Sequence, residues 1–272
     1  MIPEPVAVVA LAGLATSATR FIRVRSDRGR VSVAMSGWLA LWVATGSTWA
    51  ARAREQLPAH MVSHIVVMFL APIALTWAGA SRHWWWMLPV SRRRALLGWW
   101  YRGRRWHLVR ALGHPILAGL ALNVVMVVSH LPKVFNFVMA HDAAMAWGME
   151  PAFLLSGALF FHHLVPSGRR RLRGALRWQL ALVSVTMLEM LVMAMAMAIF
   201  TSTAWYAMPM PGMNMTVAMP FHDQQLAAAI LWICGDFWAV PCLVAIVRRV
   251  IVRDGSLFAA LESQSSRWSA SF

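Results

Sequence analysis

Two histidines and a methionine, His60, His64 and Met68, follow one another at intervals of four residues within the apolar stretch 60–72. Side chains four residues apart lie above one another on one face of a helix. Imidazole nitrogen and thioether sulfur both bind copper, and the soft thioether favours Cu(I). Polar side chains inside a membrane are costly and are candidates for function. We therefore predict a metal-binding face here; the alternative is a polar seam that forms hydrogen bonds between helices.

A second concentration of soft side chains lies in the segment 202–225, which holds five of the 19 methionines and one histidine. Pro, Gly and Asn separate the methionines, so we expect these side chains to be exposed on a loop instead of packed in a core. Thioether and imidazole groups in such a loop predict Cu(I) binding. The alternative is a flexible apolar loop on the membrane surface, because Met is an adaptable side chain. The candidate ligands are Met208, Met210, Met213, Met215, Met219 and His222.

Three more candidate copper ligands lie in other apolar runs. Met193 and Met197 share one face of the run 178–201, and His130 closes an earlier run. Methionines of this kind also serve as packing side chains, so packing is the alternative role. The sequence shows no nucleophile–base pair and no phosphate-binding loop, so we expect a protein that is not an enzyme.

The elements that position these residues follow from the composition. Hydrophobic residues make up 60% of the 272-residue chain and charged residues only 13%, against about 25% charged residues in soluble domains. Because a membrane-spanning helix needs about 20 mostly apolar residues, the apolar runs predict one all-α membrane domain with seven transmembrane helices. The predicted spans are approximately 3–20, 33–50, 60–80, 114–131, 148–166, 178–201 and 226–248.

The arginines predict the orientation, because 22 of the 24 lie on one side of this seven-span arrangement. Cytoplasmic connections are enriched in Lys and Arg, which places the N-terminus outside and the C-terminus in the cytoplasm. The segment 202–225 is then an outer loop, and 81–113 is a basic, aromatic cytoplasmic loop with short helices at the lipid surface. Because the arginines cluster between apolar runs, the net charge of +15 indicates contact with lipid and not with nucleic acid.

The same orientation places His60 and His130 at the outer ends of two different spans. His64 is expected about 6 Å deeper than His60, at 1.5 Å of helix rise per residue. Met193 and Met197 lie in the outer part of another span. We therefore expect these side chains to converge in the outer third of the bilayer.

Several motifs together resemble the multi-span CtaG-type cytochrome c oxidase assembly factors. They are HMVSH and MFLAP within 60–72, HP at 114–115, SHLP at 129–132, FLLSGALFF at 153–161 and DQQLAAAILW at 223–232. The resemblance covers approximately positions 35–250. It implies a seven-span membrane protein that is required to make an active haem–copper oxidase through delivery of copper.

The resemblance extends to individual residues. His60 and His64 match a histidine pair of the family, His130 matches the His before Leu-Pro, and Asp223 matches the Asp of the DQQ motif. The chain departs from the family in the stretch AWGME, where Glu150 and the alanine four residues before it occupy two histidine positions.

We therefore expect a multi-pass protein of the bacterial plasma membrane that binds copper, as Cu(I), at its outer face and hands it over during oxidase maturation. Its expected partners are cytochrome c oxidase subunits or a copper chaperone, together with membrane lipid. Three alternatives remain open from the sequence. They are a copper transporter or tolerance protein, a haem-binding electron-transfer protein that uses paired histidines, and a structural scaffold without a metal.

Overall fold

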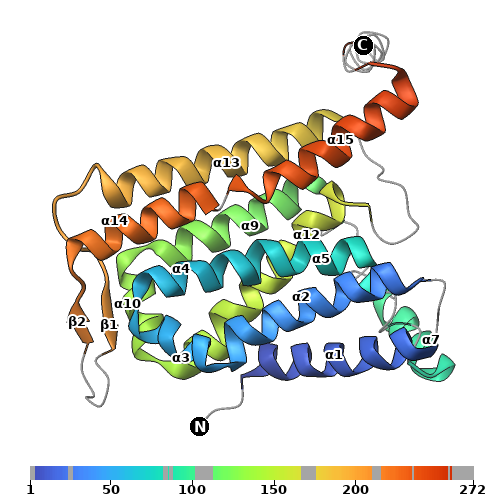
Figure 1. Ribbon diagram of the computed structural model, residues 1–272, viewed down its shortest axis with the longest axis horizontal. Coiled ribbons are helices and arrows are strands. Elements are labelled where there is room, and N and C mark those ends of the chain that lie inside the picture. The colour runs from blue at the N-terminus through green and yellow to red at the C-terminus, as the bar shows by residue number, and fades with distance from the viewer. Residues whose placement is uncertain are drawn as a thin grey trace.

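The computed structural model describes residues 4–23, 27–81, 85, 88–101, 113–166, 176–209, 216–234, 236–256 and 258. These residues form an elongated bundle in which most helices run along the long axis (Figure 1). The N-terminal half contains α1 Pro5–Arg23, α2 Arg28–Gly46, α3 Thr48–Glu55, α4 Leu57–Ile65, η2 Val66–Leu70, α5 Ala71–Ala78, α7 Val90–Tyr101, α9 Pro115–His130 and α10 Pro132–Ala140. The C-terminal half contains α11 Asp142–Ala144, η3 Met145–Met149, α12 Glu150–Leu164, α13 Leu176–Ala198, β1 Ala207–Pro209, β2 Thr216–Ala218, α14 Phe221–Ala229, η4 Ile230–Cys234 and α15 Ala239–Asp254.

The helical membrane fold expected from the apolar runs is confirmed, with a short two-stranded hairpin as its exception. Within the described residues, four helical stretches are long and apolar enough to cross a membrane, or five if α9 and α10, bent by 76°, form one span. The four are Pro5–Ile22, Leu57–Ala78, Asp142–Leu164 and Leu176–Ala198. The count of seven spans and the orientation of the termini stay predictions.

Three short π-helical segments, η2, η3 and η4, interrupt the α-helices. The first two precede prolines. Pro72 has no N–H to donate to the carbonyl four residues earlier, that of Met68, and in η2 the N–H of Ala71 bonds to the Val66 carbonyl. Before Pro151, the N–H of Glu150 likewise bonds to the Met145 carbonyl. Such π-turns are frequent at functional sites.

Close packing joins α12 to η2 and α5. Gly157 of α12 faces the backbone of Met68, and a Cβ placed on this glycine would lie 2.2 Å from the Met68 carbonyl oxygen. Small residues allow membrane helices to approach at this range. Further along the same interface, Phe69 stacks on Trp238 at 5.4 Å between ring centroids, and Phe161 meets Trp238 edge-on at 5.7 Å. These contacts therefore hold α12 firmly against η2 and α5, the segments that follow the histidine pair.

The described parts of the segment 202–225, residues 202–209 and 216–225, include two strands that the sequence did not predict. Strands β1 and β2 pair antiparallel, and the hairpin lies beside α10 at one end of the bundle, opposite to α7 (Figure 1). The Tyr206 hydroxyl donates a 2.8 Å hydrogen bond to the His130 carbonyl, and the Ala207 N–H donates to Asn136 Oδ1 at 2.9 Å. Met208 is only 3% exposed. The expectation of exposed methionines is therefore wrong at Met208, because the chain folds back onto α10 and buries this side chain.

Candidate metal centre

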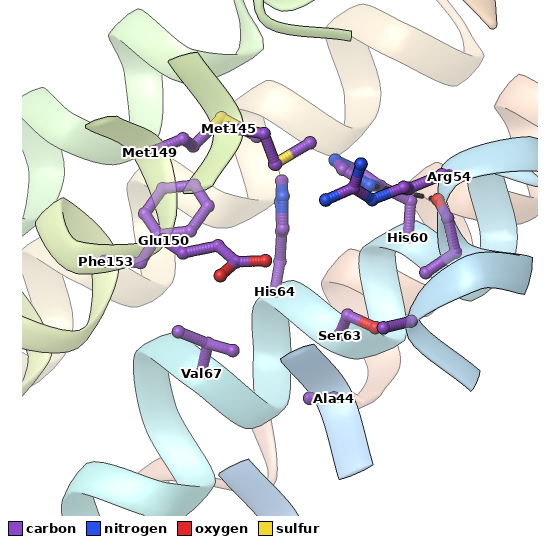
Figure 2. A pocket seen from close by; sticks show the side chains of 12 residues that line it. Ala44, Arg54, His60, Ser63, His64, Val67, Met145, Met149, Glu150 and Phe153 are labelled. Atoms are coloured by element: carbon purple, nitrogen blue, oxygen red, sulfur yellow. Dashed lines mark hydrogen bonds between the residues drawn. The ribbon is translucent and has the colours of Figure 1, made fainter. Parts of the chain in front are cut away.

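A small cavity lies next to the side chains of His60 and His64 (Figure 2). Its volume is about 30 Å³, which is room for an ion or one to two waters. Three parts of the chain form its wall: the end of α2 with α3, the run from α4 into η2, and the run from η3 into α12. The lining residues are Ala44, Ala50, Ala53, Arg54, His60, Ser63, His64, Val67, Met145, Met149, Glu150 and Phe153.

His60 and His64 occupy one face of α4, as their spacing predicts, and both are buried. Their ring centroids lie 4.1 Å apart. His60 Nδ1 lies 3.2 Å from the Ala53 carbonyl oxygen. Because a carbonyl only accepts, this nitrogen carries the proton, and the lone pair is then on Nε2. Among the described residues, neither this Nε2 nor either ring nitrogen of His64 has a hydrogen-bond partner.

His130 approaches the pair from the end of α9, with its ring centroid 5.5 Å from that of His64. Its Nδ1 lies 2.7 Å from the Met126 carbonyl oxygen and 3.2 Å from Ser129 Oγ. Its buried Nε2 has no partner in the part of the chain that the structure describes. A ring held through one nitrogen with the other left open is the usual arrangement of a histidine that binds a metal.

The opposite wall of the cavity is formed by η3 and the start of α12. Met145 and Met149 point into the same space as His64, and Glu150 also lines the cavity (Figure 2). Both methionines are buried, at 6% exposure each. The wall facing the histidines therefore carries two neutral sulfur donors and one carboxyl group.

Arg54 brings a positive charge to the mouth of the cavity. Its guanidinium donates hydrogen bonds to Glu4 and, at 2.5 Å, to Asp142 Oδ1. These contacts join residues that are 50 and 88 positions apart in the chain. Two carboxylates thus offset the arginine charge beside the site, which lowers the electrostatic cost of a cation in the cavity.

The predicted ligands separate into distinct groups in the structure. His60, His64 and His130 come together as expected. Met68 is buried in η2 but does not line the cavity, where Val67 takes the next position. The remaining candidates also lie outside the lining: Met193 is half-buried and Met197 buried on α13, Met208 is buried, Met219 is half-buried and His222 is exposed beside Asp223. Met210, Met213 and Met215 lie outside the described residues.

Four lining residues with sulfur or charged side chains were not among the predicted ligands: Met145, Met149, Glu150 and Arg54. The two methionines are four residues apart, the same spacing that identified the histidine pair, and this was a usable signal. In the described ranges, no three side chains of the types His, Cys, Asp and Glu are placed so as to hold a metal. A site that combines two imidazoles with thioethers is of a different kind, and the cavity has the side chains for it.

Comparison with known proteins agrees with the motifs. The family model described as cytochrome c oxidase caa3 assembly factor (Caa3_CtaG) matches residues 11–253. Neither the curated proteins nor the solved structures include a match to the chain. Since the family model covers nearly the whole chain, the protein belongs to the cytochrome c oxidase caa3 assembly factor family.

Proposed function

We propose that this assembly factor binds Cu(I) in the cavity at His60 and His64 and hands it over during maturation of the oxidase. The observation that carries the proposal is the buried histidine pair with open ring nitrogens facing a cavity of ionic size. A buried polar atom without a partner costs about 1–3 kcal/mol. Several such atoms around one cavity favour a site that is completed by a ligand over a polar seam between helices.

The chemistry of the donors supports copper as this ligand. Neutral imidazole is a good copper ligand, and burial disfavours the charged form of an imidazole. The His130 ring lies next to that of His64. His130 is therefore a candidate to receive the ion from His64 at the end of α9. The rings of His60 and His64 are tilted by 60° to each other and those of His64 and His130 meet edge to face, so the three imidazoles form a row along which ligands can be exchanged one at a time.

The hairpin end of the bundle is the expected exit. Tyr206 bonds to the His130 carbonyl, so the segment with the remaining methionines begins next to the last histidine of the row. We propose that Met219 and His222, with the methionines between β1 and β2, exchange copper with an oxidase subunit or a copper chaperone at the outer membrane face. Membrane lipid surrounds the helices in this proposal, and the host membrane is the bacterial plasma membrane.

A haem-binding role at the histidine pair has no support in the geometry. Pockets for drug-sized ligands and cofactors measure roughly 300–1,000 Å³, whereas this cavity measures about 30 Å³. The scaffold alternative predicts that the histidines can be replaced without effect on the oxidase, and a transporter predicts copper uptake into vesicles.

Anaerobic titration of purified protein with Cu(I) against a chelator tests the proposal. The wild type should bind Cu(I), and a His60→Ala/His64→Ala variant should bind at least about 100-fold more weakly, since even the partners of metal ligands are worth roughly 10–100-fold in affinity. A His222→Ala variant removes an imidazole from the proposed exit and should leave the Cu(I) affinity of the cavity unchanged, because His222 is exposed and does not line the cavity. Equal affinity in the wild type and the His60→Ala/His64→Ala variant would contradict the proposal.

A further inference from the structure

A pair of methionines faces the histidine pair across the cavity. Met145 and Met149 belong to η3, lie four residues apart and both line the space into which His60 and His64 point. Figure 2 shows their side chains directed toward His64 from the opposite wall. The cavity therefore lies between two i, i+4 pairs, one of imidazoles on α4 and one of thioethers on η3.

We propose that Met145 and Met149 are ligands that make this site selective for Cu(I) over Zn(II) and other divalent ions; the inference rests on the proposed function. Imidazoles alone suit zinc, copper, iron and nickel alike, whereas thioethers are soft donors that favour Cu(I). Thioethers and neutral imidazoles carry no charge, so these four ligands leave the full charge of the ion, +1 for Cu(I) and +2 for Zn(II). In a buried cavity the lower charge is the less costly one.

Packing alone does not account for the placement of these two side chains. Other buried methionines, such as Met61 and Met190, are fully buried outside the cavity. Met145 and Met149 instead border the cavity that they share with His60 and His64, whose open ring nitrogens have no partner among the described residues. The π-turn that carries them ends at Glu150, whose N–H bonds to the Met145 carbonyl ahead of Pro151. The two thioethers are therefore carried by a single π-helical turn that ends directly before Glu150 and Pro151.

The test compares Met145→Leu/Met149→Leu with the control Met61→Leu/Met190→Leu. Both double variants exchange two buried methionines for leucine, a swap that conserves volume and is usually well tolerated. Each protein is titrated anaerobically with Cu(I) and separately with Zn(II). We expect the cavity variant to lose about tenfold or more in Cu(I) affinity, with Zn(II) affinity unchanged, and the control to match the wild type in both titrations.

X-ray absorption at the copper edge gives a readout that needs no variant. Wild-type protein loaded with Cu(I) should show sulfur as well as nitrogen scatterers in the first coordination shell, and the Met145→Leu/Met149→Leu variant should lose the sulfur contribution. Unchanged Cu(I) affinity in this variant, or a first shell of nitrogen only in the wild type, would overturn the inference. The proposed function would still stand in that case if Cu(I) binding depended on His60 and His64. Absence of Cu(I) binding by the wild type would overturn both.

Discussion

At Gly157, helix α12 packs closely against the backbone of η2, near Met68. A Cβ at this position would lie 2.2 Å from the Met68 carbonyl oxygen and 3.1 Å from Pro72 Cγ. Ordinary carbon–oxygen contacts are about 3.3 Å or longer, so Gly157→Ala requires a displacement of about 1 Å between the two segments. The obstacle is a backbone atom in a helix and cannot be moved by a change of rotamer.

The expected cost follows from this displacement. Overpacking a well-filled core costs typically about 1–3 kcal/mol, and the contact with backbone places Gly157→Ala near the upper end of that range. The same movement separates Phe153 on α12 from His64 on α4, whose rings now lie 4.5 Å apart between centroids. We therefore expect both a lower free energy of unfolding and a weaker affinity for Cu(I).

Gly148→Ala is the matched control. Gly148 belongs to η3 and has no atom within 4 Å of the position of an added Cβ, counting the described residues. Alanine is favoured over glycine in a helix by about 1 kcal/mol, so this variant should be as stable as the wild type or slightly more stable. Thermal unfolding in detergent, together with Cu(I) titration, compares the two variants. Equal stability and equal affinity for Gly157→Ala and Gly148→Ala would refute the reasoning about the interface.

Two further predictions concern the contacts around the cavity. Glu4→Gln should lower the free energy of unfolding more than Asp142→Asn, because the Glu4 side chain is 19% exposed and that of Asp142 is 69% exposed, and exposed ion pairs contribute only about 0–1 kcal/mol; equal losses would contradict this ranking. Tyr206→Phe should cost about 1 kcal/mol by removing the hydrogen bond to the His130 carbonyl. Burial raises the pKa of Tyr206, so the wild type should keep its stability up to about pH 10 and lose stability above it as the phenol ionises in the unfolded chain. The variant should lose less over the same range, and chemical unfolding followed at several pH values measures both effects; parallel pH profiles would contradict the role of this phenol.

The histidine pair was predictable because its signal is local. His60 and His64 are four residues apart in an apolar run, and helix periodicity alone places them on one face. Their meeting with His130 also followed from sequence, since the alternation of spans places the start of one and the end of another at the same membrane face. The first contact follows from the repeat of a single helix. The second follows from the direction in which each span crosses the membrane.

The opposite wall of the cavity depends on packing that periodicity does not describe. Met145 and Met149 line the cavity together with His60 and His64, and this arrangement depends on the close packing of α12 on η2 through Gly157. The contacts of Arg54 with Glu4 and Asp142 span 50 and 88 positions and have no local signature. The burial of Met208 has the same cause: the Pro and Gly residues of the segment 202–225 indicate a turn, but not that β1 packs against α10.

The central claim is that the protein supports oxidase assembly by binding copper at His60 and His64. Its most direct test is the copper content of cytochrome c oxidase isolated from cells in which the His60→Ala/His64→Ala variant replaces the wild-type chain, with the amount of variant in the membrane matched to the wild type. We predict that these cells contain an oxidase with its haem but deficient in copper. Oxidase from cells with the His222→Ala variant should contain more copper than oxidase from the His60→Ala/His64→Ala cells. Oxidase with full copper content and activity in the His60→Ala/His64→Ala cells would contradict the account and favour a scaffold that acts without a metal.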